Sequence, residues 1–403
     1  MAFLNFLRKI KFIVRGYHFG LALLGVLIYL FPSRKIFVIG VTGTKGKTTM
    51  LEVLNNILTA NGERVAVLSS LYFRVGDSQE KNLTNNTMPG RMFVQKFLRR
   101  AVKARCRYAL VEVTSEGVVF SRHRFVNWRM AVLTNLASEH IESHGSFEKY
   151  REAKLSFLKY AFSQKAQLFF NRDDVSADFF ESQFKNEGER VKFYSKSDLR
   201  KIFPSVDNIH YLFSSDFNKE NLAAAVAVAE SLRVSNEVIR DAGLKFSGVP
   251  GRMEFVQRDP FSVVVDYAHT PASLEKVYVN LKNLAKGKLI CVLGSAGGGR
   301  DKWKRAEMGA LAQKFCSEII LTNEDPYDED PRKILLDVKS GIDDGKVSET
   351  LDRGEAIKKA INLAKEGDVV VITGKGSEPF IHMAGGERVV WSDGETARSA
   401  LQN

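Results

Sequence analysis

From residue 36 onward, short runs of apolar residues alternate with stretches in which apolar residues recur every three or four positions. Short apolar runs are typical of buried strands, and the longer period is typical of helices that bury one face. The predicted strands are 36–42, 64–70, 108–114, 130–135, 167–171, 262–267, 288–294, 318–322 and 368–373, with helices near 47–61, 91–104, 146–162 and 219–233. Such alternation predicts a mostly parallel sheet covered on both faces, so we expect the α/β class.

The stretch Gly248–Gly251 separates two of these strand and helix series and is the best candidate for a domain boundary. We therefore expect a central domain at 36–248 with a P-loop-type parallel sheet, and a C-terminal Rossmann-like α/β domain at 249–403. A chain of 403 residues is long enough for two or three domains, each with its own core.

Residues 1–35 follow a different pattern. Apolar residues recur at helical spacing from Phe3 to Val14 with bases between them, and an uninterrupted run of thirteen apolar or glycine residues follows from Phe19 to Phe31. A bilayer span needs about 20 residues, so this run is short for one. Three interpretations remain: a helix in the cytoplasmic membrane interface, which we favour, a hairpin or tilted span, and a helix packed on the protein body.

The charge of the chain supports the membrane interpretation over a nucleic-acid partner. The chain has 59 Lys and Arg against 47 Asp and Glu, a net charge of +12, and residues 1–35 hold six bases and no acid. Half of the net charge therefore lies on the apolar N-terminal segment, and the remainder is mild for an enzyme. The three cysteines, Cys106, Cys291 and Cys316, are widely spaced, so we expect neither a disulfide nor a metal site, as in a reducing cytosol.

A glycine-rich turn follows the first predicted strand and precedes a predicted helix. Backbone N–H groups in such a turn cradle phosphate, the lysine reaches the terminal phosphates, and the threonine hydroxyl binds Mg²⁺. The spacing Gly43-x-x-Gly46-Lys47-Thr48 is shorter than that of the usual P-loop. The candidate ATP-binding residues are Gly43, Thr44, Lys45, Gly46, Lys47, Thr48 and Thr49.

This short loop resembles the nucleotide loop of the Mur ligases, the ATP-dependent amide ligases of peptidoglycan precursor synthesis, and the chain is most similar to the tripeptide synthetase branch. Glu112 ends a strand and could share a Mg²⁺ with Thr48. The resemblance implies that His140 binds a second Mg²⁺ and that Lys154 carries a carbamate. Taken alone, His140 would be read as a surface histidine and Lys154 as an exposed helix lysine.

Further motifs extend the resemblance toward the C-terminus. Asn221 opens an alanine-rich helix and either meets the nucleotide, as in the family, or only caps the helix. The resemblance implies that Arg252, Asp266 and His269 close over ATP from the C-terminal domain. It implies that the incoming amino acid is held by Arg300, Glu324, Asp325, Gly374 and Glu378. Arg300 suits a substrate carboxylate, but Tyr327 stands where diaminopimelate-adding members have an arginine, so the amino acid stays open.

The acceptor side is only partly recognisable. The resemblance assigns Thr87, Thr114 and Arg122 to the peptide end of a muramyl-peptide acid, whereas we expect the family's N-terminal uridine-diphosphate domain to be absent. We expect phosphate transfer to the acceptor carboxylate, with Lys47, Glu112, His140 and Lys154 as catalytic residues, followed by attack of the amino acid. We further expect a cytoplasmic monomer at the inner face of the membrane. The alternatives are a ligase for a poly-γ-glutamate or folate-type acid, and a membrane-bound P-loop NTPase that does not ligate.

Overall fold

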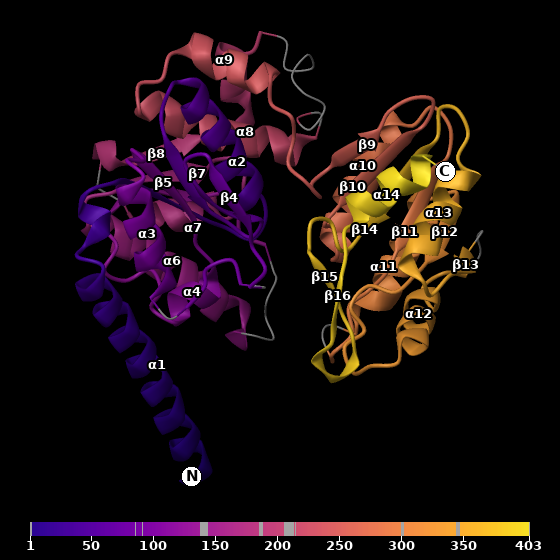
Figure 1. Cartoon of the computed structure of the whole chain (residues 1–403), viewed down its shortest axis with the longest axis horizontal. Coiled ribbons are helices and arrows are strands. Elements are labelled where there is room, and N and C mark those ends of the chain that lie inside the picture. Colours follow the sequence, from indigo (N-terminus) through magenta and orange to yellow (C-terminus); the bar gives the residue numbers. More distant parts are fainter. Residues whose placement is uncertain are drawn as a thin grey trace. The chain divides into compact units, whose positions relative to one another are not determined.

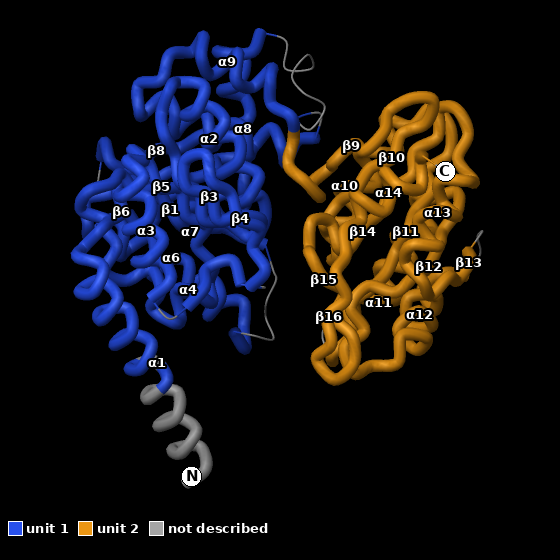
Figure 2. Tube along the Cα trace, viewed as in Figure 1, with its two compact units in different colours: residues 1–247 blue, residues 248–403 orange. Residues whose placement is uncertain are grey.

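The computed structural model (Figure 1) describes residues 2–84, 86–90, 92–137, 144–184, 188–204, 213, 215–299, 302–343 and 347–402, with side chains in the first helix described at residue 14 and from residue 16. The chain divides into two compact units, residues 1–247 and residues 248–403 (Figure 2). Each unit has its own mostly parallel sheet with helices packed on it. The predicted α/β class is therefore confirmed.

The described part of the first unit contains one eight-stranded sheet, with strand order β4-β3-β2-β5-β1-β6-β7-β8. Its strands are β1 (Phe37–Thr42), β2 (Val65–Leu68), β3 (Tyr72–Val75), β4 (Ser78–Lys81), β5 (Tyr108–Glu112), β6 (Trp128–Leu133), β7 (Gln167–Asn171) and β8 (Val191–Tyr194). β1 lies in the middle and pairs in parallel with β5 and β6, so the loop after β1 leaves from the centre of the sheet. Among the described strands, only β3 runs opposite to the others, so the pairs β2–β3 and β3–β4 at one edge are antiparallel.

Helices cover both faces of this sheet. The helices in the described part of this unit are α1 (Ala2–Ile28), α2 (Lys47–Ala60), α3 (Phe93–Lys103), α4 (Ser115–Val119), α6 (Phe147–Ser163), α7 (Ala177–Ser182), α8 (Asp216–Ser231) and α9 (Asn236–Leu244), of which α1 packs on α3 and α9 on α2. Packing is close at Gly40 in β1, where a Cβ atom would lie 2.7 Å from the ring of Phe157 and 2.8 Å from that of Trp128. A larger residue at this position would push α6 away from the sheet.

The end of α1 packs on the rest of the first unit. His18 and Phe19 contact the rings of Phe120 and Phe125, at centroid distances of 4.6 and 5.1 Å, and α1 also contacts α3. The other side of the helix is exposed and apolar, at Tyr17, Leu23, Leu24, Leu27 and Ile28. Among the described residues, no helix is long and apolar enough to cross a membrane.

The second unit has a six-stranded sheet in its described part, with strand order β13-β12-β11-β14-β10-β9, in which only β9 runs antiparallel to its neighbour. Its strands are β9 (Glu254–Gln257), β10 (Ser262–Asp266), β11 (Leu289–Leu293), β12 (Glu318–Leu321), β13 (Val347–Glu349) and β14 (Val369–Thr373), and a separate hairpin is formed by β15 (Phe380–His382) and β16 (Arg388–Val390). Its helices are α10 (Pro271–Leu284), α11 (Lys304–Phe315), α12 (Pro331–Lys339), α13 (Arg353–Leu363) and α14 (Asp393–Gln402).

The expectation of no disulfide was wrong. Cys291 in β11 and Cys316 directly after α11 form a disulfide, with their Cα atoms 6.1 Å apart, whereas Cys106 is free and buried. The two cysteines are 25 residues apart in sequence. After the helix that follows a parallel strand, however, the chain comes back beside that strand, and here this places Cys316 next to Cys291. Spacing along the chain therefore did not reveal the pair.

Candidate active site

The loop between β1 and α2 is shaped by two glycines with positive φ angles, +147° at Gly43 and +80° at Gly46. A Cβ atom on Gly43 would overlap the hydroxyl of Thr134, and one on Gly46 would overlap the side-chain oxygen of Asn221. Only glycine therefore fits at these two positions. The loop leads into the N-terminus of α2, where Lys47 is the first helical residue and Thr48 and Thr49 are buried.

Residues after β6 hold this loop from one side. The amide of Lys45 donates to Asn135 Oδ1 at 2.9 Å, and Thr134 Oγ1 donates to the carbonyl oxygen of Lys45 at 2.7 Å. From α6, the hydroxyl of Tyr150 donates to Thr44 Oγ1 at 3.0 Å. The loop is thus preorganised by two other parts of the unit, the segment after β6 and helix α6, as a phosphate site requires.

Two lysine ammonium groups converge on the same loop. Lys47 Nζ donates to the carbonyl oxygens of Gly43 and Thr44, at 3.0 and 2.9 Å. Lys154 Nζ, from α6, donates to the carbonyl oxygen of Gly43 at 2.7 Å, and the residue is only 1% exposed. Lys154 is therefore not the exposed helix lysine that its sequence position alone would suggest.

Three oxygen-bearing side chains meet beside the start of α2. Thr48 Oγ1 donates to Glu112 Oε2 at 3.0 Å and lies 3.0 Å from Ser70 Oγ, while the amide of Ser70 also donates to Glu112 Oε2 at 3.0 Å. Hydroxyl and carboxylate oxygens are the ligands that Mg²⁺ prefers. The structure thus brings the predicted pair Thr48 and Glu112 together and adds Ser70, two residues after β2, which sequence reasoning missed.

The predicted second metal ligand, His140, lies outside the described residues. In the described part of the chain, His144 lies near Lys154: its Nε2 is 3.0 Å from Ser115 Oγ, and its ring is 5.4 Å from that of Tyr150. Burial, together with the charge of Lys154, lowers the pKa of His144. Within the described residues, no group of three or more His, Cys, Asp or Glu side chains could hold a metal ion.

Asn221, the candidate nucleotide contact in α8, is buried and lies against Gly46 of the loop. Its Nδ2 donates to Asn218 Oδ1 at 3.1 Å. Asn221 lies within the first two turns of α8, after the N-cap residue Ser215. A role in helix capping alone therefore does not account for this asparagine.

The three residues assigned to the acceptor peptide lie after β4 and β5. The guanidinium of Arg122 donates through Nη1 to Asn86 Oδ1 at 3.0 Å and to the carbonyl oxygen of Met88 at 2.5 Å, so it holds both neighbours of Thr87. Thr114 caps α4 by accepting a hydrogen bond from the amide of Gly117 at 3.1 Å.

In the second unit, the predicted nucleotide residues surround the turn before β9. The carboxylate of Asp266 accepts hydrogen bonds from the amides of Met253 at 2.7 Å and Ala268 at 2.8 Å. The guanidinium of Arg252 stacks on the ring of Tyr267 at 4.2 Å. His269 Nδ1 lies 2.8 Å from the carbonyl oxygen of Tyr267. Asp266 thus positions the turn that carries Arg252.

The residues predicted to hold the amino acid gather at the carboxyl ends of β12 and β14, around Lys375. The Lys375 ammonium donates to both oxygens of Asp325, at 2.9 and 2.8 Å, and to Glu378 Oε2 at 2.6 Å. Burial alone would lower the pKa of Lys375, but the two carboxylates outweigh it and raise this pKa. Tyr267 donates to Glu378 Oε1 at 2.8 Å. Lys375 was missed from the sequence, although it lies directly after Gly374.

Glu324 is the unusual member of this group. Its Oε2 is buried without a hydrogen-bond partner and lies against Gly374, and burial raises the pKa of its carboxyl to about 7, with Arg353 and Lys375 opposing the rise. A buried acceptor that lacks a partner fits a ligand with a hydrogen-bond donor, such as an ammonium group. Arg300, the predicted partner for a substrate carboxylate, lies outside the described residues.

Comparison with known proteins places both units in one family. Residues 41–236 match the Mur ligase middle domain, and residues 251–376 match the domain described as "Mur ligase, glutamate ligase domain". The chain belongs to the Mur ligase family. The family predicted from the short phosphate loop is therefore confirmed.

Curated relatives share about a third of their residues with this Mur ligase. A UDP-N-acetylmuramoyl-L-alanyl-D-glutamate–2,6-diaminopimelate ligase of Aquifex aeolicus is 36% identical over 388 residues, which are 92% of this chain and 78% of the relative. The ligase of the same name from Clostridioides difficile is 33% identical over 401 residues, 93% of this chain and 80% of the relative.

Solved structures agree with this assignment. A structure of a ligase with the same name is 31% identical, with a TM-score of 0.61, and covers 91% of this chain and 78% of its own. A Mycobacterium tuberculosis folylpolyglutamate synthase has a TM-score of 0.68 at 17% identity, with 89% of this chain and 93% of that chain covered, and shows a shared fold only.

Proposed function

We propose that this Mur ligase is an ATP-dependent ligase that joins an amino acid to a carboxylate of a muramyl-peptide-type acceptor through an amide bond. The observation that carries the proposal is the convergence of Lys47, Lys154 and the Thr48–Glu112 pair on one phosphate loop. In this proposal residues 1–35 form an N-terminal segment, residues 36–248 bind ATP, and residues 249–403 bind the amino acid.

The residues of the first unit fit ATP and Mg²⁺. The glycine loop excludes side chains from the phosphate position, and Thr48, Ser70 and Glu112 offer oxygen ligands on one side of it. Mg²⁺, when bound, neutralises charge on the phosphate groups. Lys47 stabilises the negative charge of the phosphoryl group during its transfer to the acceptor carboxylate. Because the loop is preorganised, its backbone N–H groups can stabilise the same charge without rearrangement.

We assign the second Mg²⁺ of the proposed site to His140 and to a carbamate on Lys154. Supporting evidence is the burial of the Lys154 amine next to Gly43 and its distance of 4.5 Å from the ring of Tyr150. Carbamylation would convert a buried cation into an anion and would relieve its repulsion of a metal ion. In ¹³C-bicarbonate, NMR should show a carbamate signal that Lys154→Ala removes and that Lys159→Ala, on the exposed side of the same helix, retains. A signal that survives Lys154→Ala would refute the assignment.

In the second unit, we propose that Glu324, Asp325, Gly374 and Glu378 form the amino-acid site, with Arg300 for the substrate carboxylate. The unpartnered Glu324 oxygen suits the ammonium group of an amino acid. We further propose that Arg252 and His269 contact the nucleotide and that Asp266 fixes the turn that carries Arg252.

Phosphate release in the presence of single amino acids tests the function. We expect release to require both a muramyl-peptide acid and one amino acid, with an amide product that mass spectrometry detects. Release without any amino acid would instead indicate an NTPase, and turnover of only a folate or poly-γ-glutamate acid would indicate a different ligase. The screen should include lysine and diaminopimelate, since Tyr327 replaces the family arginine.

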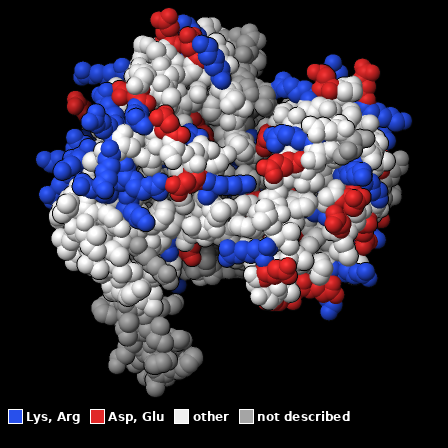
Figure 3. Space-filling model, in the orientation of Figure 1, with Lys and Arg blue, Asp and Glu red and all other residues white. Residues whose placement is uncertain are grey.

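We also propose that the enzyme acts as a monomer at the inner face of the cytoplasmic membrane, attached through α1. The exposed leucines of α1 suit the acyl boundary, and α3, which contacts α1, carries Lys96, Arg99, Arg100 and Lys103. In Figure 3, an uncharged patch of the first unit lies next to α1, and Lys and Arg side chains gather on the far side of that patch. Vesicles with anionic lipid should sediment the protein, and Leu24→Glu should weaken this binding. Equal sedimentation of both proteins would contradict the proposal.

A further inference from the structure

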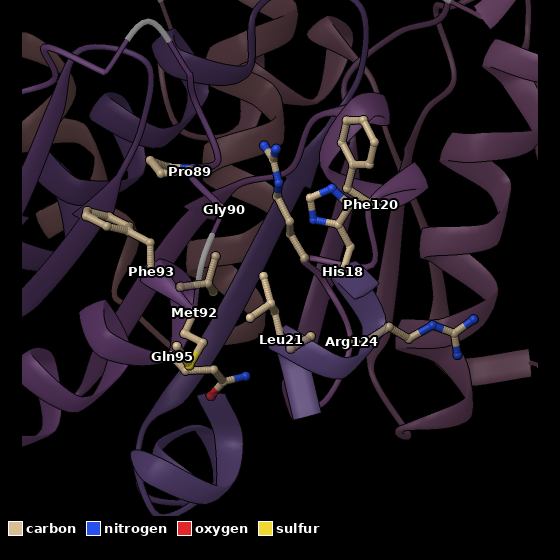
Figure 4. Close-up of a pocket in the computed structure, with 12 residues that line it drawn as sticks. His18, Leu21, Pro89, Gly90, Met92, Phe93, Gln95, Phe120 and Arg124 are labelled. Carbon is tan, nitrogen blue, oxygen red and sulfur yellow. The ribbon is translucent and has the colours of Figure 1, made fainter. Parts of the chain in front are cut away.

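The crevice between α1, the segment 89–95 and the turn 120–124 is lined by side chains such as Leu21 and Met92 (Figure 4). It has room for only about one water molecule, so it offers no site for a larger ligand. A buried arginine of the second unit, Arg353, has more to contribute, because it contacts the backbone on which the proposed amino-acid site is built.

The guanidinium of Arg353, the first residue of α13, joins the carboxyl ends of β12 and β14. Its Nη1 donates to the carbonyl oxygen of Asn323 at 3.2 Å, and its Nη2 donates to the carbonyl oxygen of Thr373 at 2.8 Å. Asn323 directly precedes Glu324, and Thr373 directly precedes Gly374. One side chain therefore holds the backbone immediately before two residues of the proposed amino-acid site.

The same guanidinium is paired with Asp393, at the start of α14. Arg353 Nε donates to Asp393 Oδ1 at 2.7 Å and Nη2 donates to Oδ2 at 2.8 Å, while the indole of Trp391 donates to Oδ1 at 2.8 Å. Arg353 and Asp393 are 3% and 0% exposed. The segment 373–393 thus has both of its ends bonded to one guanidinium, and it contains Glu378 and the hairpin β15–β16. Arg353 closes the base of this segment.

The hairpin, in turn, is bonded to the residues after β12. The amide of His382 donates to Asp325 Oδ1 at 2.8 Å, and the amide of Tyr327 donates to the carbonyl oxygen of His382 at 3.0 Å. The segment 373–393 and the residues after β12 are therefore joined in two places, at the hairpin and at Arg353.

The guanidinium also lies near the Glu324 side chain. A Cβ atom on Gly294 would lie 2.9 Å from Cβ of Glu324 and 3.5 Å from Nη1 of Arg353, so the two side chains flank this glycine. Burial raises the pKa of the Glu324 carboxyl and Asp325 adds to the rise, whereas Arg353 and Lys375 oppose it. A fixed positive charge here favours the carboxylate form, which accepts a hydrogen bond from an ammonium group.

We infer that Arg353 is a positioning residue for the incoming amino acid, because it holds Glu324, Gly374 and the base of the segment 373–393 in one arrangement. The inference rests on the proposed function, which places the amino acid at these residues. An arginine with a purely structural role would stabilise the second unit without a particular effect on the affinity for the amino acid.

The conservative variant Arg353→Lys tests the inference. It keeps a positive charge for Asp393, but a single ammonium group cannot occupy the three positions of Nε, Nη1 and Nη2. We expect KM for the amino acid to rise about tenfold, while kcat and KM for ATP change less than about twofold. Ile361→Ala, a core substitution on the same helix, is the matched control. It should lower the stability of the unit in urea unfolding and leave KM for the amino acid unchanged.

A double variant, Arg353→Gln/Asp393→Asn, guards against misfolding of Arg353→Lys, because it leaves neither member of the ion pair as an unpaired buried charge. It should also raise KM for the amino acid. If both variants keep the wild-type KM for the amino acid, or if Ile361→Ala raises this KM as much as they do, the inference is overturned and the ligase function stands.

A wild-type protein that releases no phosphate in response to any amino acid would instead contradict the proposed function. Hydrogen exchange, followed by mass spectrometry, then decides whether Arg353 holds the segment 373–393. Faster exchange of this segment in Arg353→Lys but not in Ile361→Ala supports the positioning role, and unchanged exchange in Arg353→Lys overturns it.

Discussion

The two units of this Mur ligase use lysine in opposite ways. In the first unit, the ammonium groups of Lys47 and Lys154 donate to neutral carbonyl oxygens of the phosphate loop. In the second unit, the ammonium group of Lys375 donates to the carboxylates of Asp325 and Glu378. The first arrangement surrounds the amines with neutral acceptors, whereas the second neutralises the ammonium charge with carboxylates of the protein.

The carboxylates differ in the same way. Glu112 accepts hydrogen bonds from a hydroxyl and an amide, while Glu324 is buried with an unpartnered oxygen. The first unit is therefore suited to an anionic phosphate group, and the second to a ligand that brings a proton donor. A ligase that uses ATP and adds an amino acid needs both environments. Here the first is built on the sheet of the first unit and the second on the sheet of the second unit.

The largest expected effect on catalysis is in the first unit. Lys47→Met removes the cation from the phosphate loop, so kcat should fall by at least about 100-fold. Because Lys47 donates to carbonyl groups of its own loop, the free energy of unfolding should change by less than about 1 kcal/mol. Steady-state phosphate release and urea unfolding measure the two quantities, with Lys159→Met as a matched control. A large loss of stability would show that Lys47 is structural.

The matching change in the second unit should affect stability instead. Lys375 is fully buried, and Lys375→Met leaves two carboxylates without their cation, which should cost about 3–5 kcal/mol of unfolding free energy. The double variant Lys375→Met/Asp325→Asn should recover part of this loss in urea unfolding. If the single variant is as stable as the wild type, the contrast between the two lysines does not hold.

Glu324 predicts a pH dependence of stability. Burial raises the pKa of Glu324 to about 7, so the folded chain holds a proton that the unfolded chain releases near its ordinary pKa. Stability should therefore fall as pH rises through this window, by about 3 kcal/mol in total. Glu324→Gln cannot ionise and should lack this decline. Urea unfolding of both proteins between pH 4.5 and 8 measures the difference, and parallel curves would contradict it.

The sequence was most informative where strands are buried on both faces. β1, β5, β10 and β14 are continuous apolar runs, so their positions were predicted closely. β4 was missed because its four residues are exposed and polar, and its pairing with β3 is a tertiary property. The three-residue strands β13 and β15 are too short to carry a period.

The candidate site was predictable where a side chain directly follows a buried strand. Glu112 was singled out in this way, and it accepts a hydrogen bond from Thr48. Ser70 and Tyr150 were missed because neither residue belongs to a motif or lies at a spacing that sets it apart in the sequence. Asp266 was expected to face the nucleotide, and its hydrogen bonds to two backbone amides, which no pattern reveals, indicate a positioning role.

The smallest expected effect concerns Ser70 and the Mg²⁺ concentration that the enzyme requires. It tests whether this requirement depends on the first unit alone. Ser70→Ala removes a hydroxyl 3.0 Å from Thr48 Oγ1 but keeps the amide that binds Glu112. The Mg²⁺ concentration for half-maximal phosphate release should therefore rise only about fivefold, equivalent to about 1 kcal/mol. Thr48→Ala should raise it further, because it removes the hydroxyl bonded to Glu112. Glu378→Gln, in the second unit, should raise KM for the amino acid without changing the Mg²⁺ requirement. A shift of the Mg²⁺ requirement in Glu378→Gln would show that the two environments share the metal.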